Sequence, residues 1–315
     1  MTRLGVLVNP ASGRGLGAKA GPVVIATLRS SGYEVVDLTA PDALSARTRA
    51  AAFLLEGGAD ALIAVGGDGV VNLAVNAVLT HAPAVPIGLV AAGTGNDTAR
   101  MLELPLRDHA AATTHLIAAL GREPRVIDVG VITPGLAAQA EGSATRRYFV
   151  TIASVGVDAA VVARTGRLRW PKGPARYVLG LLIELVHFRG FDTTISVDGV
   201  DVAGAGTIAA VANSSSFGGG MHIAPQASWT DGLFHVITAP TVARRTLLQV
   251  FPRVYKGTHV EHPVVTVTTG REVVLDSSGR PGRKAPAPLA HADGEPVGPV
   301  PLTLRVQPGA LRVLA

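Results

Sequence analysis

The stretch that decides the fold runs from residue 61 to residue 79 and reads ALIAVGGDGVVNLAVNAVL. Its first five residues are apolar and predict a buried strand, and Val70–Leu79 has the apolar spacing of a helix. Between them lies Gly66-Gly67-Asp68-Gly69, whose glycines permit a sharp turn. A strand, a glycine turn and a helix in direct succession predict one unit of an α/β sheet.

The same alternation extends to both sides of this stretch. We expect strands at Leu4–Val8, Tyr33–Leu38, Ala61–Val65 and Ile87–Val90, and helices at Ala18–Ser30, Ala43–Glu56, Thr98–Met101 and Ala110–Leu120. Strands that alternate with helices predict a doubly wound parallel sheet, in which ligands bind beyond the carboxyl ends of the strands. Residues 1–127 are therefore predicted to form an α/β domain.

After about Arg125 the pattern changes to short β-rich segments, most of which are separated by Gly, Pro and Asp turns. These segments are Val126–Ile132, Tyr148–Ser154, Thr193–Val197, Thr207–Asn213, Leu233–Thr238 and Val264–Thr268. They predict an antiparallel β-sandwich domain over residues 128–299, interrupted by helices at Ala175–Phe188 and Val242–Tyr255. A Pro- and Gly-rich loop is expected at Ser277–Pro288, and the chain is expected to return to the first domain near residues 300–315.

Composition and charge narrow the class of protein. The 315 residues include no cysteine, 48% are apolar and 16% are charged, which excludes a disordered chain, a disulfide framework and thiol chemistry. Residues 1–127 carry 10 basic and 10 acidic side chains, so the other 18 basic and 13 acidic ones, and the whole net charge of +5, fall in residues 128–315. The excess suggests an anionic partner, and ordinary solubilising charge is the alternative.

No segment has the character of an export signal or a membrane span. The apolar run Leu4–Val8 is too short for a signal peptide. The longest apolar stretch, Tyr177–Phe188, contains Glu184 and His187 and is shorter than the roughly 20 residues that a spanning helix needs. The sequence predicts a cytoplasmic protein that is soluble or bound to the membrane periphery.

The loop after the first strand can be read in more than one way. Gly13-Arg14-Gly15-Leu16-Gly17-Ala18 satisfies the dinucleotide pattern G-x-G-x-x-A, and Glu34 and Asp37 follow about 20 residues later. A nicotinamide or flavin site is therefore one interpretation, and a glycine turn without function is another. The preceding Asn9-Pro10-Ala11-Ser12 lengthens the loop with polar side chains, whereas a dinucleotide-binding turn is short and bare, so a different kind of nucleotide loop is favoured.

Two further glycine loops predict a phosphate site. In Gly66-Gly67-Asp68-Gly69 the backbone can approach phosphate oxygens closely, and the acid can address Mg²⁺ or its water shell. Gly93-Thr94-Gly95-Asn96-Asp97 follows the next strand and adds a hydroxyl and a second carboxylate at the same edge. Taken alone, the first loop is also consistent with a turn in which Asp68 caps a helix. Together the loops predict a nucleoside triphosphate site without a Walker A sequence.

With these loops and further motifs, the chain resembles the diacylglycerol kinase catalytic family, which includes bacterial lipid kinases and sphingosine kinases. The resemblance covers nearly the whole chain. It rests on Asn9-Pro10-Ala11-Ser12-Gly13, Gly66-Gly67-Asp68-Gly69, Gly93-Thr94-Gly95-Asn96-Asp97, the run from Phe217-Gly218-Gly219-Gly220 through Pro225 to Asp231-Gly232-Leu233, and Asp293-Gly294-Glu295.

The resemblance implies transfer of the γ-phosphoryl group of ATP to a lipid hydroxyl. The residues implied to hold the nucleotide are Asn9, Pro10, Ala11, Ser12, Gly13, Thr39, Gly66, Gly67, Asp68, Gly69, Val70, Val71, Asn72 and Thr94. A magnesium site is implied at the Asp231 carboxylate and the main-chain carbonyls of Ser228 and Leu233, with Asp68 and Asp97 reached through water. The general base is implied in Asp293-Gly294-Glu295; we assign it to Glu295, with Asp293 as its neighbour or substitute. These roles suit phosphoryl transfer, which needs neutralised phosphates and an oriented hydroxyl.

Two positions depart from the family pattern. The second loop is usually followed by Thr and, three residues later, by Glu, whereas this chain has Val70 and Leu73. A phosphate-facing hydroxyl and a nearby carboxylate are lost, so we expect Asn72 and the backbone N–H groups to carry more of the phosphate contact.

Basic residues next to apolar ones predict contact with a lipid surface. Arg164, Arg167, Arg169, Lys172 and Arg176 surround Trp170, and Arg244, Arg245, Arg253 and Lys256 surround a second apolar set that includes Phe251 and Tyr255. Such a pattern fits an anionic membrane, although core helices with solvated charged ends would look similar. Nucleic acid is disfavoured as a partner because only 4% of residues are aromatic and no binding motif occurs. His259-Val260-Glu261-His262 lacks the spacing of a zinc motif.

The sequence thus predicts a lipid kinase that uses ATP and Mg²⁺ at the inner face of the membrane, with diacylglycerol as acceptor and phosphatidic acid as product. The alternatives are a sphingoid-base or other lipid kinase, an NAD kinase-like enzyme and a nucleotide-binding protein without catalysis. Whether the chain forms a homodimer is left open.

Overall fold

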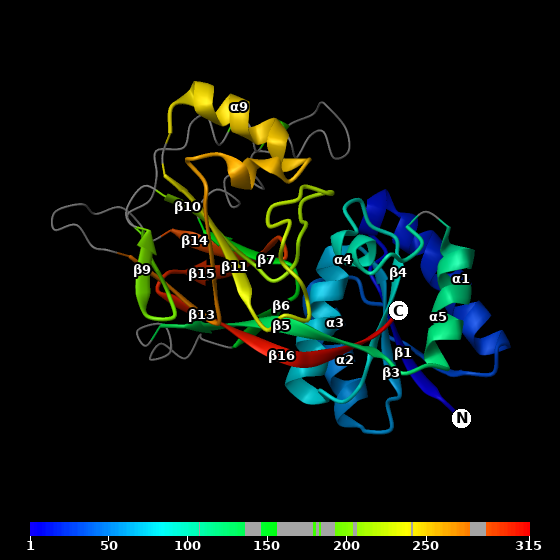
Figure 1. Ribbon diagram of the computed structural model, residues 1–315. Helices are drawn as coiled ribbons and strands as arrows, with labels where there is room; N and C mark the ends of the chain where they lie inside the picture. Colours follow the sequence, from blue (N-terminus) through cyan, green and yellow to red (C-terminus); the bar gives the residue numbers. More distant parts are fainter. Residues whose placement is uncertain are drawn as a thin grey trace. The chain divides into compact units, whose positions relative to one another are not determined.

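The computed structural model describes residues 1–106, 108–135, 146–155, 179–180, 183, 193–203, 207–240, 242–277 and 288–315 (Figure 1). The chain divides into two compact units, of which unit 1 comprises Met1–Val129 and Pro308–Ala315 and unit 2 comprises Gly130–Gln307. Strands β5 (Arg125–Pro134) and β16 (Leu302–Leu314) each have residues in both units. The helix expected at Ala175–Phe188 and the basic cluster around Trp170 lie almost wholly outside the described residues.

Unit 1 is built on a parallel sheet with strand order β2-β1-β3-β4. The strands are β1 (Arg3–Val8), β2 (Glu34–Asp37), β3 (Ala61–Gly66) and β4 (Ile87–Ala91). The end of β16 adds a further parallel strand beside β4, where Val313 lies opposite Ile87. The winding direction reverses between β1 and β3, and in such a sheet the loops that leave the strands there open a crevice for ligands. The predicted α/β fold is confirmed.

Helices cover both faces of this sheet. Helices α1 (Leu16–Ser30) and α5 (His109–Leu120) pack together on one face, and α2 (Ala43–Leu55) and α3 (Asp68–His81) pack together on the other (Figure 1). All six residues of β3 are consequently buried, which explains why that strand is a continuous apolar run. The short helix α4 (Asp97–Met101) and the 3₁₀ turn η1 (Ser12–Arg14) follow β4 and β1 respectively.

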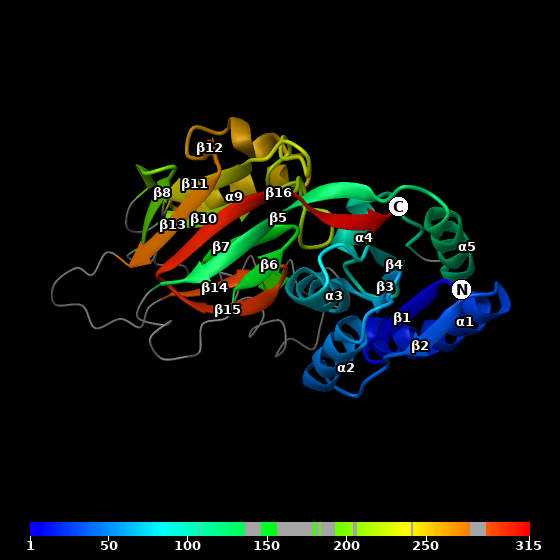
Figure 2. The same ribbon diagram turned by 90° about the horizontal axis from the view of Figure 1, so that it is seen from below.

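Unit 2 contains two antiparallel layers (Figure 2). One is a six-stranded sheet with the order β12-β11-β10-β7-β14-β15, formed by Thr266–Gly270, Phe234–Pro240, Thr207–Ala212, Ile152–Val155, Leu289–Ala292 and Glu295–Pro299. The other combines parts of β5 and β16 with β6 (Arg147–Phe149), β8 (Thr193–Val197), β9 (Val200–Ala203) and β13 (Glu272–Ser277). Side chains from both layers form one core, in which the rings of Phe149 and Phe234 stack 5.7 Å apart. The predicted β-sandwich is confirmed.

The structure differs from the expected strands at one instructive place. The segment expected as one strand, Tyr148–Ser154, is divided into β6 and β7. The division falls where the N–H groups of Val150 and Thr151 donate hydrogen bonds to the Asp293 carboxylate rather than to a neighbouring strand. The helix expected at Val242–Tyr255 is α9 (Arg244–Val254), which packs against the 3₁₀ turn η2 (Thr258–Glu261).

Candidate functional site

Three loops of unit 1 meet at the carboxyl edge of the parallel sheet, and glycine is required where they touch. A methyl group on Gly93 would lie 2.3 Å from the Cα of Gly67, and one on Gly13 would lie 2.4 Å from the carbonyl oxygen of Ala92. One on Gly66 would lie 2.9 Å from Oγ of Ser12. The loops after β1, β3 and β4 therefore pack backbone against backbone, and the predicted Ser12, Gly13, Gly66 and Gly67 form one surface.

The loop after β1 folds back over the beginning of α1. The Asn9 side chain accepts a hydrogen bond from the Ala11 N–H at 3.0 Å, and the Asn9 N–H donates to the Val65 carbonyl at 3.2 Å. Gly17 lies so close that a methyl group there would be 2.0 Å from the Asn9 carbonyl oxygen. Gly17, which occupies a variable position of the dinucleotide-like pattern, thus serves helix-to-loop packing.

The loop after β4 is fixed by Asn96. This residue adopts the left-handed conformation with φ of 54°, and its amide brackets the backbone of Gly93, accepting from the N–H at 2.9 Å and donating to the carbonyl at 3.0 Å. The guanidinium of Arg100 donates to the Gly95 carbonyl at 3.2 Å. Thr94 is exposed at the tip, where its hydroxyl can meet a ligand.

Asp68 and Asp97, predicted to share this edge, are brought together. They stand in the first turns of α3 and α4, and a methyl group on Gly95 would lie 2.9 Å from Oδ2 of Asp68 and 3.6 Å from Oδ2 of Asp97. The Thr98 N–H donates to Oδ1 of Asp68 at 3.2 Å, which links the two helices. Two carboxylates beside a phosphate would repel it unless a cation lay between them.

The two residues that depart from the family pattern, Val70 and Leu73, lie at buried positions in the first turns of α3. Val70, Val71 and Asn72 are all buried, and Cγ1 of Val70 fills the space where a methyl group on Gly66 would come within 2.6 Å. Leu73 is only 8% exposed, so a glutamate at this position would have to be buried. Oδ1 of Asn72 accepts a hydrogen bond from Asn76 at 3.3 Å.

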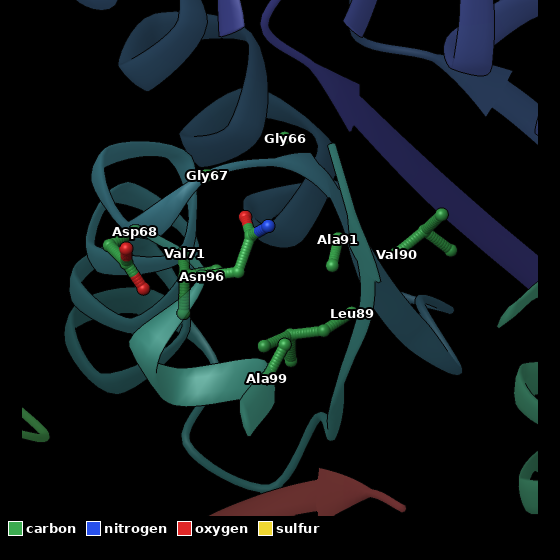
Figure 3. A pocket seen from close by; sticks show the side chains of 9 residues that line it. All are labelled: Gly66, Gly67, Asp68, Val71, Leu89, Val90, Ala91, Asn96 and Ala99. Atoms are coloured by element: carbon green, nitrogen blue, oxygen red, sulfur yellow. The ribbon is translucent and has the colours of Figure 1, made fainter. Parts of the chain in front are cut away.

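A small pocket of about 180 Å³ lies on the inner side of these loops (Figure 3). Its lining consists of Gly66, Gly67, Asp68, Val71, Leu89, Val90, Ala91, Asn96 and Ala99. Figure 3 shows the Asn96 amide directed toward the Gly67 loop and the Asp68 carboxylate turned away from the apolar side chains. This volume includes space open to solvent, and the cavity itself measures only about 10 Å³, which is about the room for one water molecule, so a nucleotide would have to lie on the outer side of the loops.

In unit 2 the predicted magnesium segment forms a tight turn. Oδ1 of Asp231 accepts from the Leu233 N–H at 3.0 Å, and Oδ2 lies 3.2 Å from Nε2 of His235, a contact that the sequence did not suggest. Among the described residues no group of three or more His, Asp or Glu side chains could hold a metal ion, so main-chain oxygens would have to contribute. One carboxylate with the Ser228 and Leu233 carbonyls is an all-oxygen donor set, which suits Mg²⁺.

Asp293 and Glu295 share one hairpin but have different surroundings. Asp293 and Gly294, both at positive φ, form the turn between β14 and β15. The Asp293 carboxylate is 6% exposed and accepts from the N–H groups of Val150 and Thr151 at 3.0 and 2.8 Å and from the Thr151 hydroxyl at 2.5 Å. Glu295 is exposed.

Unit 2 also holds a larger pocket with a cavity volume of about 230 Å³. Apolar residues form most of its lining, which consists of Ala224, Pro225, Gln226, His235, Ile237, Val260, Glu261 and Val267. His259 next to it is 4% exposed, and its Nε2 lies 2.9 Å from the Ile223 carbonyl. Burial lowers the pKa of His259 and outweighs this hydrogen bond, which acts in the opposite direction.

Known proteins resemble this chain in sequence and in fold. The family model of the diacylglycerol kinase catalytic domain matches residues 3–132, and that of the YegS C-terminal NAD kinase beta sandwich-like domain matches residues 151–315. A diacylglycerol kinase from Mycobacterium tuberculosis (strain CDC 1551 / Oshkosh) is 35% identical over 309 residues, which is 98% of this chain and 93% of the relative. A diacylglycerol kinase from Staphylococcus carnosus (strain TM300) is 27% identical over 301 residues, 95% of this chain and 90% of the relative.

A solved structure shows the same fold. The crystal structure of a diacylglycerol kinase from Bacillus anthracis str. Sterne matches 99% of this chain and 96% of its own, with a TM-score of 0.68. Its sequence is 15% identical, so this likeness concerns the fold alone.

Proposed function

Because the chain belongs to the diacylglycerol kinase catalytic family, we propose that it transfers the γ-phosphoryl group of ATP to the hydroxyl of diacylglycerol and forms phosphatidic acid. The observation that carries this proposal is the edge of unit 1, where three glycine loops pack together beside the carboxylates of Asp68 and Asp97. Close backbone approach suits phosphate oxygens, and the carboxylate pair suits the cation that accompanies a triphosphate.

The candidate donors in each unit are oxygen atoms, which supports magnesium as the cation in this proposal. Ser228, Asp231 and Leu233 would hold it directly, and Asp68 and Asp97 would bind through its water shell. When bound, the ion neutralises phosphate charge that develops during transfer. The residues of the chain itself position the loops that carry these donors: Asn96 fixes Gly93, and the Thr98 N–H orients Asp68.

Glu295 is the general base in this proposal. A base must be able to take up the proton of the lipid hydroxyl, and the exposed carboxylate of Glu295 can do so. Protonation of Asp293 would instead disturb the three hydrogen bonds that it accepts from Val150 and Thr151. Asp293 therefore acts as a positioning residue that shapes the hairpin on which Glu295 stands.

Lipid is favoured as the acceptor by unit 2. The pocket of about 230 Å³ has mainly apolar walls, which can contact part of an acyl chain. Two of the residues that line it, Val260 and Glu261, belong to η2, which packs against α9.

Helix α9 presents basic residues at the surface of unit 2. Arg245, Arg253 and Lys256 are exposed on and after α9, and Tyr255 is 39% exposed. Among the residues that the structure describes, none forms a helix long and apolar enough to cross a bilayer. We propose that α9 contacts an anionic membrane surface peripherally.

The membrane contact is tested with vesicles. Arg245→Glu with Arg253→Glu should reduce binding to vesicles of anionic lipid by about 30-fold or more, since each basic residue near such a surface contributes about 1 kcal/mol and 1.4 kcal/mol corresponds to a factor of ten. Each single substitution is also measured, and Arg271→Glu, which reverses one exposed charge in the β12–β13 turn, is the control for the single variants. Equal affinity of the wild type for neutral and anionic vesicles would remove this part of the proposal.

The substrate is tested by following the labelled γ-phosphate of ATP in the presence of Mg²⁺. Diacylglycerol, sphingosine and ceramide are offered separately in mixed micelles, and NAD in buffer. We expect label in phosphatidic acid alone. Label in a sphingoid base would change the acceptor, label in NAD would replace the lipid kinase by a nicotinamide nucleotide kinase, and ATP binding without transfer would indicate a non-catalytic protein.

A further inference from the structure

Thr39, at the carboxyl end of β2, is held through both polar groups of its main chain. Its N–H donates to Oδ1 of Asp37 at 2.8 Å, and its carbonyl accepts a hydrogen bond from Nη1 of Arg49. Its neighbours Leu38 and Ala40 are 5% and 6% exposed, whereas Thr39 itself is only partly buried. Both polar groups of the Thr39 main chain thus have partners within the protein, while its side chain keeps part of its surface exposed.

Arg49 reaches this carbonyl from a helix that is itself well anchored. Asp42 caps the N-terminus of helix α2, and its carboxylate accepts hydrogen bonds from both the N–H and the hydroxyl of Ser45 at 2.8 Å. Ala50 and Phe53, on its inner face, are buried to 0% and 2% exposure. Arg49 lies on the exposed side, and a guanidinium has five N–H donors, so one hydrogen bond to Thr39 leaves others for a further partner.

The hydrogen bond between Arg49 and the Thr39 carbonyl lies near the edge of the sheet at which the candidate site is found. β2 is parallel to β1, β3 and β4, so its carboxyl end lies at the same edge as the three glycine loops. The side chains already placed at the middle of this edge, Asp68 and Asp97, are acidic. Arg49 brings a permanent positive charge to the β2 end, where an anionic nucleotide would benefit from it.

We propose that Arg49 is a positioning residue for ATP: it fixes the Thr39 carbonyl so that the Thr39 hydroxyl is presented to the nucleotide, and its charge favours the bound phosphates. This rests on the proposed use of ATP. Nothing in the local sequence suggests the role, because Arg47 on the same helix is an equally exposed arginine.

The test compares Arg49→Ala with Arg49→Lys and with the control Arg47→Ala. ATP affinity is measured by calorimetry, and the KM for ATP, the KM for lipid and kcat by phosphoryl transfer. Loss of a hydrogen bond from a charged donor should weaken ATP binding and raise its KM by about tenfold, with the KM for lipid unchanged and kcat within about twofold. Arg49→Lys should recover part of the affinity, because it keeps the charge. The melting temperature of each variant reports whether the fold is retained.

A double-mutant cycle with Thr39→Val distinguishes an effect of Arg49 that acts through Thr39 from an effect on ATP affinity that is independent of Thr39. If Arg49 acts through Thr39, the two substitutions together should cost less affinity than the sum of the single costs. Additive costs, an equal loss in Arg47→Ala, or unchanged ATP affinity in Arg49→Ala would overturn the inference. A wild-type protein that does not bind ATP at all would instead overturn the proposed function.

Discussion

Two carboxylates that stand two residues apart can differ completely in what they are able to do. Asp293 is surrounded by three donors that belong to residues far away in the sequence, while Glu295 projects from the next strand into solvent. Hydrogen bonds of this kind stabilise the charged form of an acid and oppose its use as a proton acceptor. At the scale of single residues, the surroundings therefore divide the Asp-Gly-Glu segment into a structural part and a chemical part.

The division leads to opposite expectations for two amide substitutions. Glu295→Gln should lower kcat by about 10²- to 10⁴-fold, as expected for loss of a general base, and leave the melting temperature unchanged. Asp293→Asn should lower the free energy of unfolding by about 1–3 kcal/mol, because one donor of Val150 or Thr151 then faces an amide N–H. Thermal melts and transfer rates on both variants check this. Full activity of Glu295→Gln would exclude it as the base.

His259 makes the stability of unit 2 sensitive to mild acid. Burial lowers the pKa of His259 below the ordinary value of 6.5, so the folded chain binds a proton less readily than the unfolded chain. Its contribution to stability is therefore complete above about pH 6.5 and is lost as the pH falls through the lower folded value. Glutamine can still donate to the Ile223 carbonyl but does not titrate in this range.

We accordingly expect the free energy of unfolding to fall between pH 7.5 and 5.5, and to fall less in His259→Gln. Urea unfolding at both pH values measures the difference. His222→Gln, which removes an exposed histidine three residues from Pro225, is the matched control. If the control flattened the pH dependence as much as His259→Gln does, the effect could not be assigned to burial.

At the scale of elements, the site is made by contacts between loops rather than by any one loop. Gly67 and Gly93 follow different strands, and each leaves out the side chain that the other would meet. The order of the strands decides this contact, since β3 and β4 are neighbours and both end at the same edge. A single motif therefore has no complete binding surface of its own.

Gly93→Ala should force the two loops apart. Overpacking of this kind costs about 1–3 kcal/mol, and here it would also disturb the bracket that Asn96 forms around Gly93. We expect a lower melting temperature together with a raised KM for ATP. Gly121→Ala is the control, because a methyl group there would have its nearest neighbour 3.7 Å away and Gly121 has negative φ. Equal effects of the two substitutions would refute the packing argument.

At the scale of the whole molecule, unit 1 is completed by residues that follow unit 2 in the sequence. Leu311, Val313 and Leu314 are at most 3% exposed, and Val313 and Leu314 pair with Ile87 and Gly88 of β4. The last strand thus completes the sheet from which the three glycine loops arise. Its side chains belong to the core of unit 1 although they lie more than 170 residues beyond Val129.

Leu314→Ala should therefore destabilise the nucleotide-binding unit. Truncation of a buried leucine costs about 2–5 kcal/mol, and we expect a lower melting temperature and a weaker protection of the β3 and β4 amides in hydrogen exchange. Leu289→Ala, at a position that is 48% exposed in unit 2, should change neither quantity appreciably. Unaltered exchange in β4 of Leu314→Ala would show that the last strand does not support this sheet.

Sequence patterns predict those features of the molecule that are determined by residues close to one another in the sequence. The glycine loops, Asp68 and the alternation of strands and helices follow from neighbouring residues, and so does the fold class. The contacts of Asp293 with Val150 and Thr151 depend on how the chain folds back, over distances of up to 143 residues. Arg49 gives no signal at all, because its partner is a main-chain carbonyl, which every residue possesses.

The two-part composition of unit 1 has a consequence for the order of synthesis. On the ribosome, residues 1–129 emerge first, unit 2 follows, and Pro308–Ala315 emerge only after it. The parallel sheet of unit 1 therefore lacks the strand formed by Pro308–Ala315 until the whole of unit 2 has been translated. We expect the growing chain to complete unit 2 before unit 1 and to acquire a stable ATP-binding edge last, so that a translation product halted after Gln307 would carry the loops without the strand that supports them.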